Sequence, residues 1–174
     1  PHQSFPLCCC CHVNNETGQI QPLLQLRESL GTKCLLCIDA VQSFGRVPLL
    51  WEEAHIDLAA VSSRKIGGPQ SIGALICRRG IDLEPLILGG AQQFGLRSGT
   101  LDTVAIKLFA DSVERTCQNR SEEEKRLRNL NQYLRQNLEK LSKGNWPVFS
   151  SANSVPNIFS FAIPGFEGAL IARI

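Results

Sequence analysis

Polar side chains follow three separate apolar runs of this chain, at the point where each run ends. Asn15 follows the first run, Asp39 and Gln42 follow the second, and Ser62 to Lys65 follow the third. If these runs are parallel strands, their carboxyl ends meet at one edge of a sheet, where α/β folds bind their ligands. The sequence therefore predicts that an amide, a carboxylate, hydroxyls and an amine share one site.

This set of groups suits pyridoxal phosphate, which is at once an aldehyde, a heteroaromatic base and a phosphate. The Lys65 amine can form a Schiff base with the aldehyde. The Asp39 carboxylate can keep the ring nitrogen protonated, so that the ring accepts the electrons left when a substrate bond breaks. The phosphate needs hydroxyls, backbone N–H groups and a cation. Either residue alone has a simpler explanation, as a solvated lysine or a helix-capping aspartate, so the prediction depends on their joint order.

Five short motifs carry these groups and occur in one order along the chain. They are Asn14-Asn15-Glu16-Thr17-Gly18, Asp39-Ala40-Val41-Gln42-Ser43, Ser62-Ser63-Arg64-Lys65, Ile72-Gly73-Ala74-Leu75 and Arg97-Ser98-Gly99-Thr100. In this order, and near this spacing, they resemble the cysteine desulfurases, which belong to the class V aminotransferase branch of the pyridoxal-phosphate enzymes. The resemblance covers about residues 8 to 170.

The resemblance implies a role for each residue near the cofactor ring. Lys65 is the implied Schiff-base lysine and the one catalytic residue expected in this chain. Asp39 would pair with the pyridinium nitrogen, and Gln42 would hydrogen-bond the phenolic oxygen. Asn15 would contact the cofactor oxygen and the substrate side of the site.

The resemblance also implies which residues bind the cofactor phosphate. Ser62 and Arg64 would bind the phosphate of their own subunit. Thr100 would reach the phosphate of a partner subunit, because these enzymes are homodimers with shared sites. We also expect Asp39, Gln42, Asn15 and Lys65 to converge, and Asp39 to form an ion pair with Lys65 when no cofactor lies between them.

The implied reaction converts L-cysteine to L-alanine and passes the sulfur to a mobile cysteine as a persulfide. Sulfur-acceptor scaffold proteins are the implied partners, and iron–sulfur clusters or thio-cofactors the implied products. None of the eight cysteines matches the family's nucleophile. The resemblance implies that this cysteine and the arginine that binds the substrate carboxylate lie beyond residue 174. The chain opens on Pro1 and ends within an amphipathic pattern at residues 169–174, so we expect a fragment that is inactive alone.

The chain departs from the family pattern in two places. Arg64 stands where the family usually has histidine, and Gln92-Gln93-Phe94 stands where a more polar stretch is common. A guanidinium can bind phosphate through two hydrogen bonds, but its size and permanent charge differ from those of histidine. Two alternatives therefore stay open: a selenocysteine lyase or other class V aminotransferase, and a non-catalytic degenerate homologue.

Strands and helices alternate in the pattern that must position these residues. Apolar runs at residues 7–13, 34–38, 56–61 and 72–77 predict strands, and the first is typical of a strand covered on both faces. A helix is predicted with Pro22 in its first turn and Leu23, Leu26 and Leu30 on one face, and Gly31 is its natural end. Strand, helix and strand with short links indicate a largely parallel sheet. With the resemblance, this predicts part of a three-layer α/β/α large domain.

The pattern changes after Thr100. One helix is predicted around residues 104–113, and a second from Glu122, with leucines from Leu127 to Leu141 on one face. Residues 157–163 alternate weakly, as a strand of another sheet would. We therefore expect residues 1–120 to complete the large cofactor domain and residues 121–174 to begin a small α+β domain.

Composition excludes several classes of protein. The 174 residues carry a net charge of +2, which predicts neither a nucleic-acid nor a membrane surface. The pairs Cys8/Cys11 and Cys34/Cys37 could suggest zinc, but residues three apart in a strand point to opposite faces, so we predict no metal site. Cysteines within apolar runs favour a reducing, intracellular compartment, either cytoplasm or mitochondrial matrix.

Overall fold

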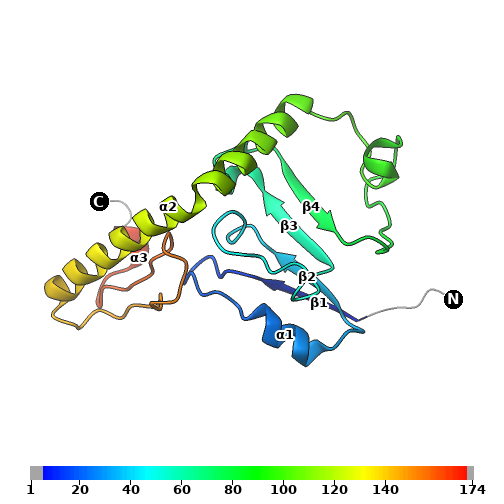
Figure 1. The fold of residues 1–174 in the computed structure, drawn as a ribbon. Coiled ribbons are helices and arrows are strands. Elements are labelled where there is room, and N and C mark those ends of the chain that lie inside the picture. The colour runs from blue at the N-terminus through cyan, green and yellow to red at the C-terminus, as the bar shows by residue number, and fades with distance from the viewer. Residues whose placement is uncertain (1–5, 172–174) are drawn as a thin grey trace.

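The computed structural model describes residues 6–171, and its centre is a four-stranded sheet with strand order β1-β2-β3-β4 (Figure 1). Strands β1 (Leu7–Cys11), β2 (Leu35–Asp39) and β3 (Leu58–Ser62) are parallel, whereas β4 (Gly73–Cys77) is antiparallel to β3. The link between β3 and β4, residues 63–72, is shorter than the dozen or more residues that a parallel crossover needs. The mostly parallel α/β fold predicted from the sequence is confirmed, with strand ends that differ by one or two residues from the predicted ones.

Helix α1 (Leu23–Leu30) makes the crossover from β1 to β2, as the leucine spacing predicted. It ends at Gly31, whose φ is +67° and whose N–H donates to the Arg27 carbonyl at 3.0 Å. Arg27 is only 8% exposed; its guanidinium donates to the Ala54 carbonyl and pairs with Asp57 at 3.1 Å. This buried arginine therefore ties α1 to the segment that leads into β3.

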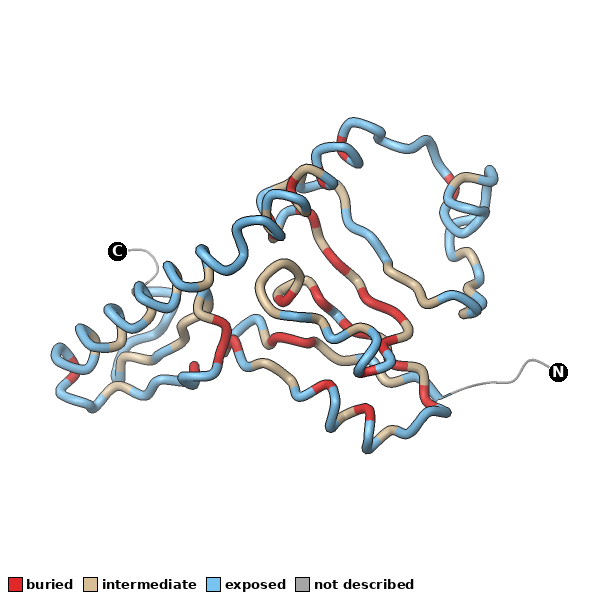
Figure 2. Tube along the Cα trace, viewed as in Figure 1, coloured by how far each residue is buried: buried red, intermediate tan, exposed pale blue. Residues whose placement is uncertain are grey.

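The buried residues of the sheet concentrate in β2 and β3 (Figure 2). Side chains on one face of these strands are buried, whereas those on the other face of the sheet are mostly half-buried or exposed, apart from the buried Leu58. The side chains of the buried face, together with those of the helices that cover them, form one core: Leu23, Leu36, Ile38, Ala59, Val61 and Phe109. On the opposite face Leu7 is 56% exposed, Leu75 is 55% exposed and Cys9 is also exposed. The prediction that the first strand is covered on both faces is wrong for the described residues, because α1, residues 40–56 and α2 all contribute to the same core.

Helix α2 (Thr103–Ser142) is one continuous helix where the sequence predicted two. The Asp102 side chain caps it by accepting from the Ala105 N–H at 2.9 Å. No glycine or proline interrupts residues 103–142, and Glu123 and Glu124 pair with arginines one turn further along the helix. The charged run that suggested a new start therefore continues the helix, and the proposed domain boundary at residue 120 falls inside it.

The segment after α2 wraps back along its second half and ends in a short helix, α3 (Gly168–Ile171). The strand predicted at residues 157–163 reduces to one bridge, between Val148 and Phe161. Proline at positions 156 and 164 restricts both ends of that stretch. Of the helix expected at residues 169–174, positions 172–174 lie outside the described residues.

Candidate active site

The carboxyl ends of β1, β2 and β3 lie side by side because the three strands are parallel (Figure 1). Cys11 pairs with Asp39, and Asp39 pairs with Ala60, so Ser62 lies two residues beyond this row. The last residues of these strands and the loops that follow them carry every predicted site residue except Thr100. The topology therefore brings these residues to a single edge of the sheet, where α/β folds bind ligands.

The loop after β1 is folded around the side chain of Asn14. Its Oδ1 accepts hydrogen bonds from the backbone N–H groups of Glu16 and Thr17, both at 2.9 Å. This Asx-type turn is a common way to close a tight loop. It leaves Asn15 exposed, with its amide donating to Glu16 Oε1 at 2.7 Å. Asn15 is therefore free to contact a ligand at the cost of one exposed hydrogen bond.

His12 also lies at this edge, although the sequence patterns did not single it out. It is 3% exposed, and its backbone N–H donates to the Asp39 carbonyl at 3.0 Å. Its Nδ1 is buried without a hydrogen-bond partner in the described structure. Burial lowers the pKa of this imidazole below its ordinary value, so the ring is neutral at physiological pH.

Asp39 ends β2 with an exposed carboxylate that the backbone partly orients. Its Oδ1 accepts from the Val41 N–H at 2.9 Å. No ion pair joins Asp39 to Lys65 within residues 6–171, so the ion pair expected from the sequence is wrong. The Asp39 carboxylate is hydrogen-bonded within its own loop. Lys65 lies in the turn that follows the neighbouring strand, β3. Gln42 is half-buried in the loop after Asp39.

The turn after β3 carries the lysine on one 3₁₀ turn, η1 (Ser63–Ile66). Gly67 ends it in the left-handed conformation, with φ +77° and ψ +21°. Gly68 has no room for a side chain, since a Cβ there would lie 2.1 Å from Ser63 Oγ. Ser63 is fully buried and its Oγ has no hydrogen-bond partner in the described structure. Glycines at these positions therefore allow a tight turn that Lys65 shares with Ser62 and the exposed Arg64.

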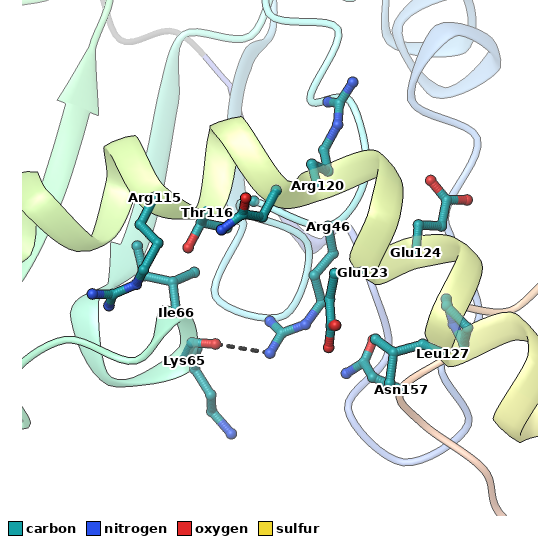
Figure 3. A pocket seen from close by; sticks show the side chains of 13 residues that line it. Arg46, Lys65, Ile66, Arg115, Thr116, Arg120, Glu123, Glu124, Leu127 and Asn157 are labelled. Atoms are coloured by element: carbon teal, nitrogen blue, oxygen red, sulfur yellow. Dashed lines mark hydrogen bonds between the residues drawn. The ribbon is translucent and has the colours of Figure 1, made fainter.

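A cavity of about 410 Å³ lies behind this turn, between the loop after β2, η1 and α2 (Figure 3). The Arg46 guanidinium lies in it and donates through Nη2 to the Lys65 carbonyl oxygen at 2.7 Å. In Figure 3 the side chain of Lys65 leads away from α2. Arg46 Nη1 is buried without a partner among the described residues, and burial lowers the pKa of this guanidinium. Sequence patterns did not single out Arg46, because nothing in its neighbourhood indicates that it faces Lys65.

Thr100 is the one predicted site residue that the structure does not bring to this edge. It is exposed, and it lies two residues before Asp102, the capping residue of α2. The preceding Ser98 is buried and donates to the carbonyls of Ile87 and Leu88 at 3.0 and 3.1 Å. The motif is therefore anchored through its serine, and Thr100 is presented to solvent.

Two cysteines of the sheet, Cys10 and Cys37, have raised pKa values that keep their thiols protonated. Cys9 and Cys37 are partners across β1 and β2. Burial, followed by the neighbouring Cys8, raises the pKa of Cys10 to about 11. Burial and the adjacent Cys9 also raise the pKa of Cys37. Because the thiolate is the nucleophile and the metal ligand, neither thiol is activated. No group of three metal-ligating side chains is arranged for an ion in the described part of the chain.

Comparison with known proteins gives consistent matches. The family described as "Aminotransferase class-V" matches residues 3–174. "Cysteine desulfurase IscS 1" of Archaeoglobus fulgidus is 39% identical over 132 residues, which is 76% of this chain and 35% of that protein. "Cysteine desulfurase, mitochondrial" of Candida maltosa is 38% identical over 129 residues, 72% of this chain and 27% of that protein.

Solved structures agree with the sequence matches. A structure titled "NIFS-LIKE PROTEIN" superposes with a TM-score of 0.89 at 31% identity, covering 97% of this chain and 47% of its own. The chain thus spans less than half the length of these relatives. Among the described residues, no helix combines the length and the apolar character needed to cross a membrane.

Proposed function

Because the chain belongs to the class V aminotransferase family, we propose that it forms the lysine-bearing half of a pyridoxal-phosphate-dependent cysteine desulfurase. The activity is assigned to the longer protein, since the chain covers 35% of its Archaeoglobus fulgidus relative. That relative and the one from Candida maltosa are both named cysteine desulfurases, which favours this activity over a selenocysteine lyase.

One observation carries the proposal: Asp39 ends one strand and Lys65 follows the carboxyl end of the parallel strand beside it. The chemistry of the groups at this edge fits pyridoxal phosphate. Lys65 offers an amine for the aldehyde, Asp39 an exposed carboxylate for the ring nitrogen, and Ser62 and Arg64 a hydroxyl and a guanidinium for the phosphate. The buried Ser63 hydroxyl, which lacks a partner in the described structure, is a further polar group at the turn.

When bound, the cofactor supplies an electron-accepting ring that stabilises the charge left on a substrate as its bonds break. Asp39 holds a proton at the ring nitrogen, and its bond from the Val41 N–H keeps one carboxylate oxygen in place. Lys65 anchors the cofactor through its Nζ and is the group placed to move protons on the substrate side. Gln42 donates to the phenolic oxygen, and Asn15 contacts the substrate side of the site.

The phosphate end of the site involves two subunits in this proposal. Ser62 and Arg64 bind the phosphate from within the chain, and the permanent charge of Arg64 suits a dianion. Thr100 binds the phosphate of a partner subunit in a homodimer, and its exposure before α2 supports this role. L-cysteine is the substrate, and sulfur-acceptor scaffold proteins of iron–sulfur or thio-cofactor synthesis receive the sulfur.

We also propose the compartment and the domain division. The protein acts inside the cell, in the cytoplasm or the mitochondrial matrix, and the mitochondrial relative from Candida maltosa supports the second of these. Residues 1–120 belong to the large cofactor domain and residues 121–174 begin the small domain.

The test replaces Lys65 in the full-length natural protein. Wild-type protein with pyridoxal phosphate should show the visible absorbance band of a lysine-bound cofactor, and should release alanine and sulfide from L-cysteine in the presence of a thiol. Lys65→Ala should abolish the band and the alanine release. Lys33→Ala is the matched control, because Lys33 is an exposed lysine outside the site.

Retention of the absorbance band in Lys65→Ala would falsify the assignment of Lys65. A wild-type protein that binds the cofactor but releases no alanine from L-cysteine would support the degenerate homologue instead. Faster release from L-selenocysteine than from L-cysteine would support a selenocysteine lyase.

A further inference from the structure

The turn that carries Lys65 leaves that residue's carbonyl without a backbone donor. At the end of η1, the Gly68 N–H donates to the Ser63 carbonyl at 3.0 Å and the Gly67 N–H donates to the Arg64 carbonyl at 3.3 Å. These two bonds form a Schellman-type ending, which satisfies two carbonyls of the turn and leaves the next ones free. Residue 69 is a proline and has no N–H to offer.

Arg46 supplies the missing donor from another part of the chain. Its Nη2 donates to the Lys65 carbonyl at 2.7 Å, which is a short, charge-assisted bond (Figure 3). A second arginine, Arg115 on α2, reaches the same turn more weakly, with 3.4 Å between its Nη2 and the Gly67 carbonyl. The turn is thus held from the β2 loop and from α2, and the bond at the lysine itself is the shorter one.

The packing around Arg46 keeps its loop close to the lysine turn. Gly45, with φ +75°, has no side chain, and a Cβ there would lie 2.5 Å from Thr116 Cγ2 and 3.3 Å from Ile66 Cγ2. This close approach brings the loop after β2 against both η1 and α2. The close packing at Gly45 therefore places the backbone of the neighbouring Arg46 within reach of the Lys65 carbonyl.

Arg46 occupies this position although burial disfavours it. Burial lowers the pKa of its guanidinium, and Nη1 has no partner in the described structure. A buried charge with incomplete hydrogen bonding lowers stability, and it persists most often where the group serves a function.

We propose that Arg46 is a positioning residue for Lys65, which fixes the backbone of the lysine so that its Nζ is presented to the cofactor. The part of this inference that concerns the cofactor rests on the proposed function. The effect of the Arg46 hydrogen bond on the stability of the turn does not depend on that function, and it can be measured without cofactor.

The experiment compares Arg46→Met and Arg46→Lys with wild type in the full-length protein, first without cofactor. Hydrogen–deuterium exchange of peptides covering residues 63–68 measures how often the turn opens. Loss of a charge-assisted bond should speed this exchange by about tenfold to a hundredfold in Arg46→Met, with exchange elsewhere unchanged. Arg46→Lys keeps a charged donor, so its exchange rate should lie between those of wild type and Arg46→Met. Arg79→Met, an exposed arginine after β4, should match wild type.

The second readout uses pyridoxal phosphate. The cofactor should dissociate faster from Arg46→Met by a similar factor, and from Arg46→Lys by less. If Arg46→Met does not fold, the exchange and dissociation rates of Arg46→Lys are compared with those of Arg79→Met instead. Exchange at residues 63–68 that stays at the wild-type rate, or that rises equally throughout the protein, overturns the proposal. If exchange at residues 63–68 is faster in Arg46→Met but the wild-type protein does not bind the cofactor, the proposed function is overturned. The stabilisation of the turn by Arg46 is then still supported.

Discussion

Three buried polar atoms without partners lie around the carboxyl edge of the sheet. Within residues 6–171 they are His12 Nδ1, Arg46 Nη1 and Ser63 Oγ, and they follow β1, β2 and β3 respectively. Buried polar groups are nearly always hydrogen-bonded, so their grouping at one edge is typical of a functional site. The sequence could predict Asp39 and Lys65 from their chemistry at strand ends. It could not predict the burial of His12 or the contact between Arg46 and Lys65, because both depend on packing against distant residues.

His12 makes stability depend on pH. Its pKa is lowered by burial in the folded state, whereas the unfolded chain has the ordinary value of about 6.5. Below that value the unfolded state binds more protons than the folded state, so the free energy of unfolding falls as pH falls, by at most about 1.4 kcal/mol per pH unit. Urea unfolding of the cofactor-free protein at several pH values between 7.5 and 5 measures this.

The control for that measurement is a pair of variants. His12→Asn should flatten the dependence below pH 6.5, because the amide does not titrate. His55→Asn changes an exposed histidine and should leave the slope as in wild type. Equal slopes in wild type and His12→Asn would show that the buried imidazole does not couple folding to protons.

At the scale of elements, the strands and α1 could be predicted because each has a complete local signal. Periodic leucines and a terminal glycine define α1, and apolar runs define the strands. The continuity of α2 could not be predicted from the acidic run at Glu122, since charges look the same at a helix start and on a solvated helix face. The stretch at residues 157–163 also fails as a strand, because a strand needs a partner and alternation alone does not supply one.

Gly45 tests how closely the loop after β2 must pack against α2. Gly45→Ala should destabilise the protein through a strained positive φ, about 1–2 kcal/mol, plus a clash with Thr116, about 1–3 kcal/mol more. Gly144→Ala is the control, because its φ is also positive, at +77°, and nothing lies within 4 Å of its Cβ position. Denaturant unfolding gives both values.

A second substitution separates the clash with Thr116 from the backbone strain at residue 45. Thr116→Ser removes the Cγ2 atom that the new Cβ would meet, so it should recover part of the loss in Gly45→Ala and none in Gly144→Ala. No recovery in the double variant would mean that backbone strain alone explains the effect.

Arg27 tests the connection between α1 and β3. Its guanidinium donates to the carbonyls of Ala54, Gly31, Cys34 and His55 and pairs with Asp57. Arg27→Met should lower the free energy of unfolding by about 3–5 kcal/mol. It removes the nearest charged partner of Asp57 and leaves the buried carbonyls of Ala54 and Cys34 without this donor. Arg128→Met, which removes an exposed helical pair with Glu124, should cost less than about 1 kcal/mol. Similar losses in the two variants would contradict the buried network.

The whole molecule has its core on one face of the sheet, and the opposite face is partly exposed. Hydrophobic periodicity predicted the order of the elements and hence the edge where the site residues meet. It could not predict which faces are covered, because an apolar run reads the same whether one or both faces are packed. The exposed face carries Leu7, Cys9 and Leu75, and Asp39 lies at its carboxyl edge.

The exposed face predicts how a polypeptide of residues 1–174 behaves in solution. Leu7 and Leu75 lie on the two edge strands of this face, and exposed apolar side chains bind hydrophobic dyes such as ANS and promote self-association. Leu7→Lys and Leu75→Lys together should roughly halve the dye fluorescence and reduce association in sedimentation, without lowering the thermal midpoint, because both side chains are more than half exposed. Leu86→Lys is the matched control, since Leu86 is 96% exposed but lies outside the sheet. If Leu86→Lys lowers the fluorescence as much as the double variant, the dye binds to scattered leucines and the sheet face is not a distinct surface.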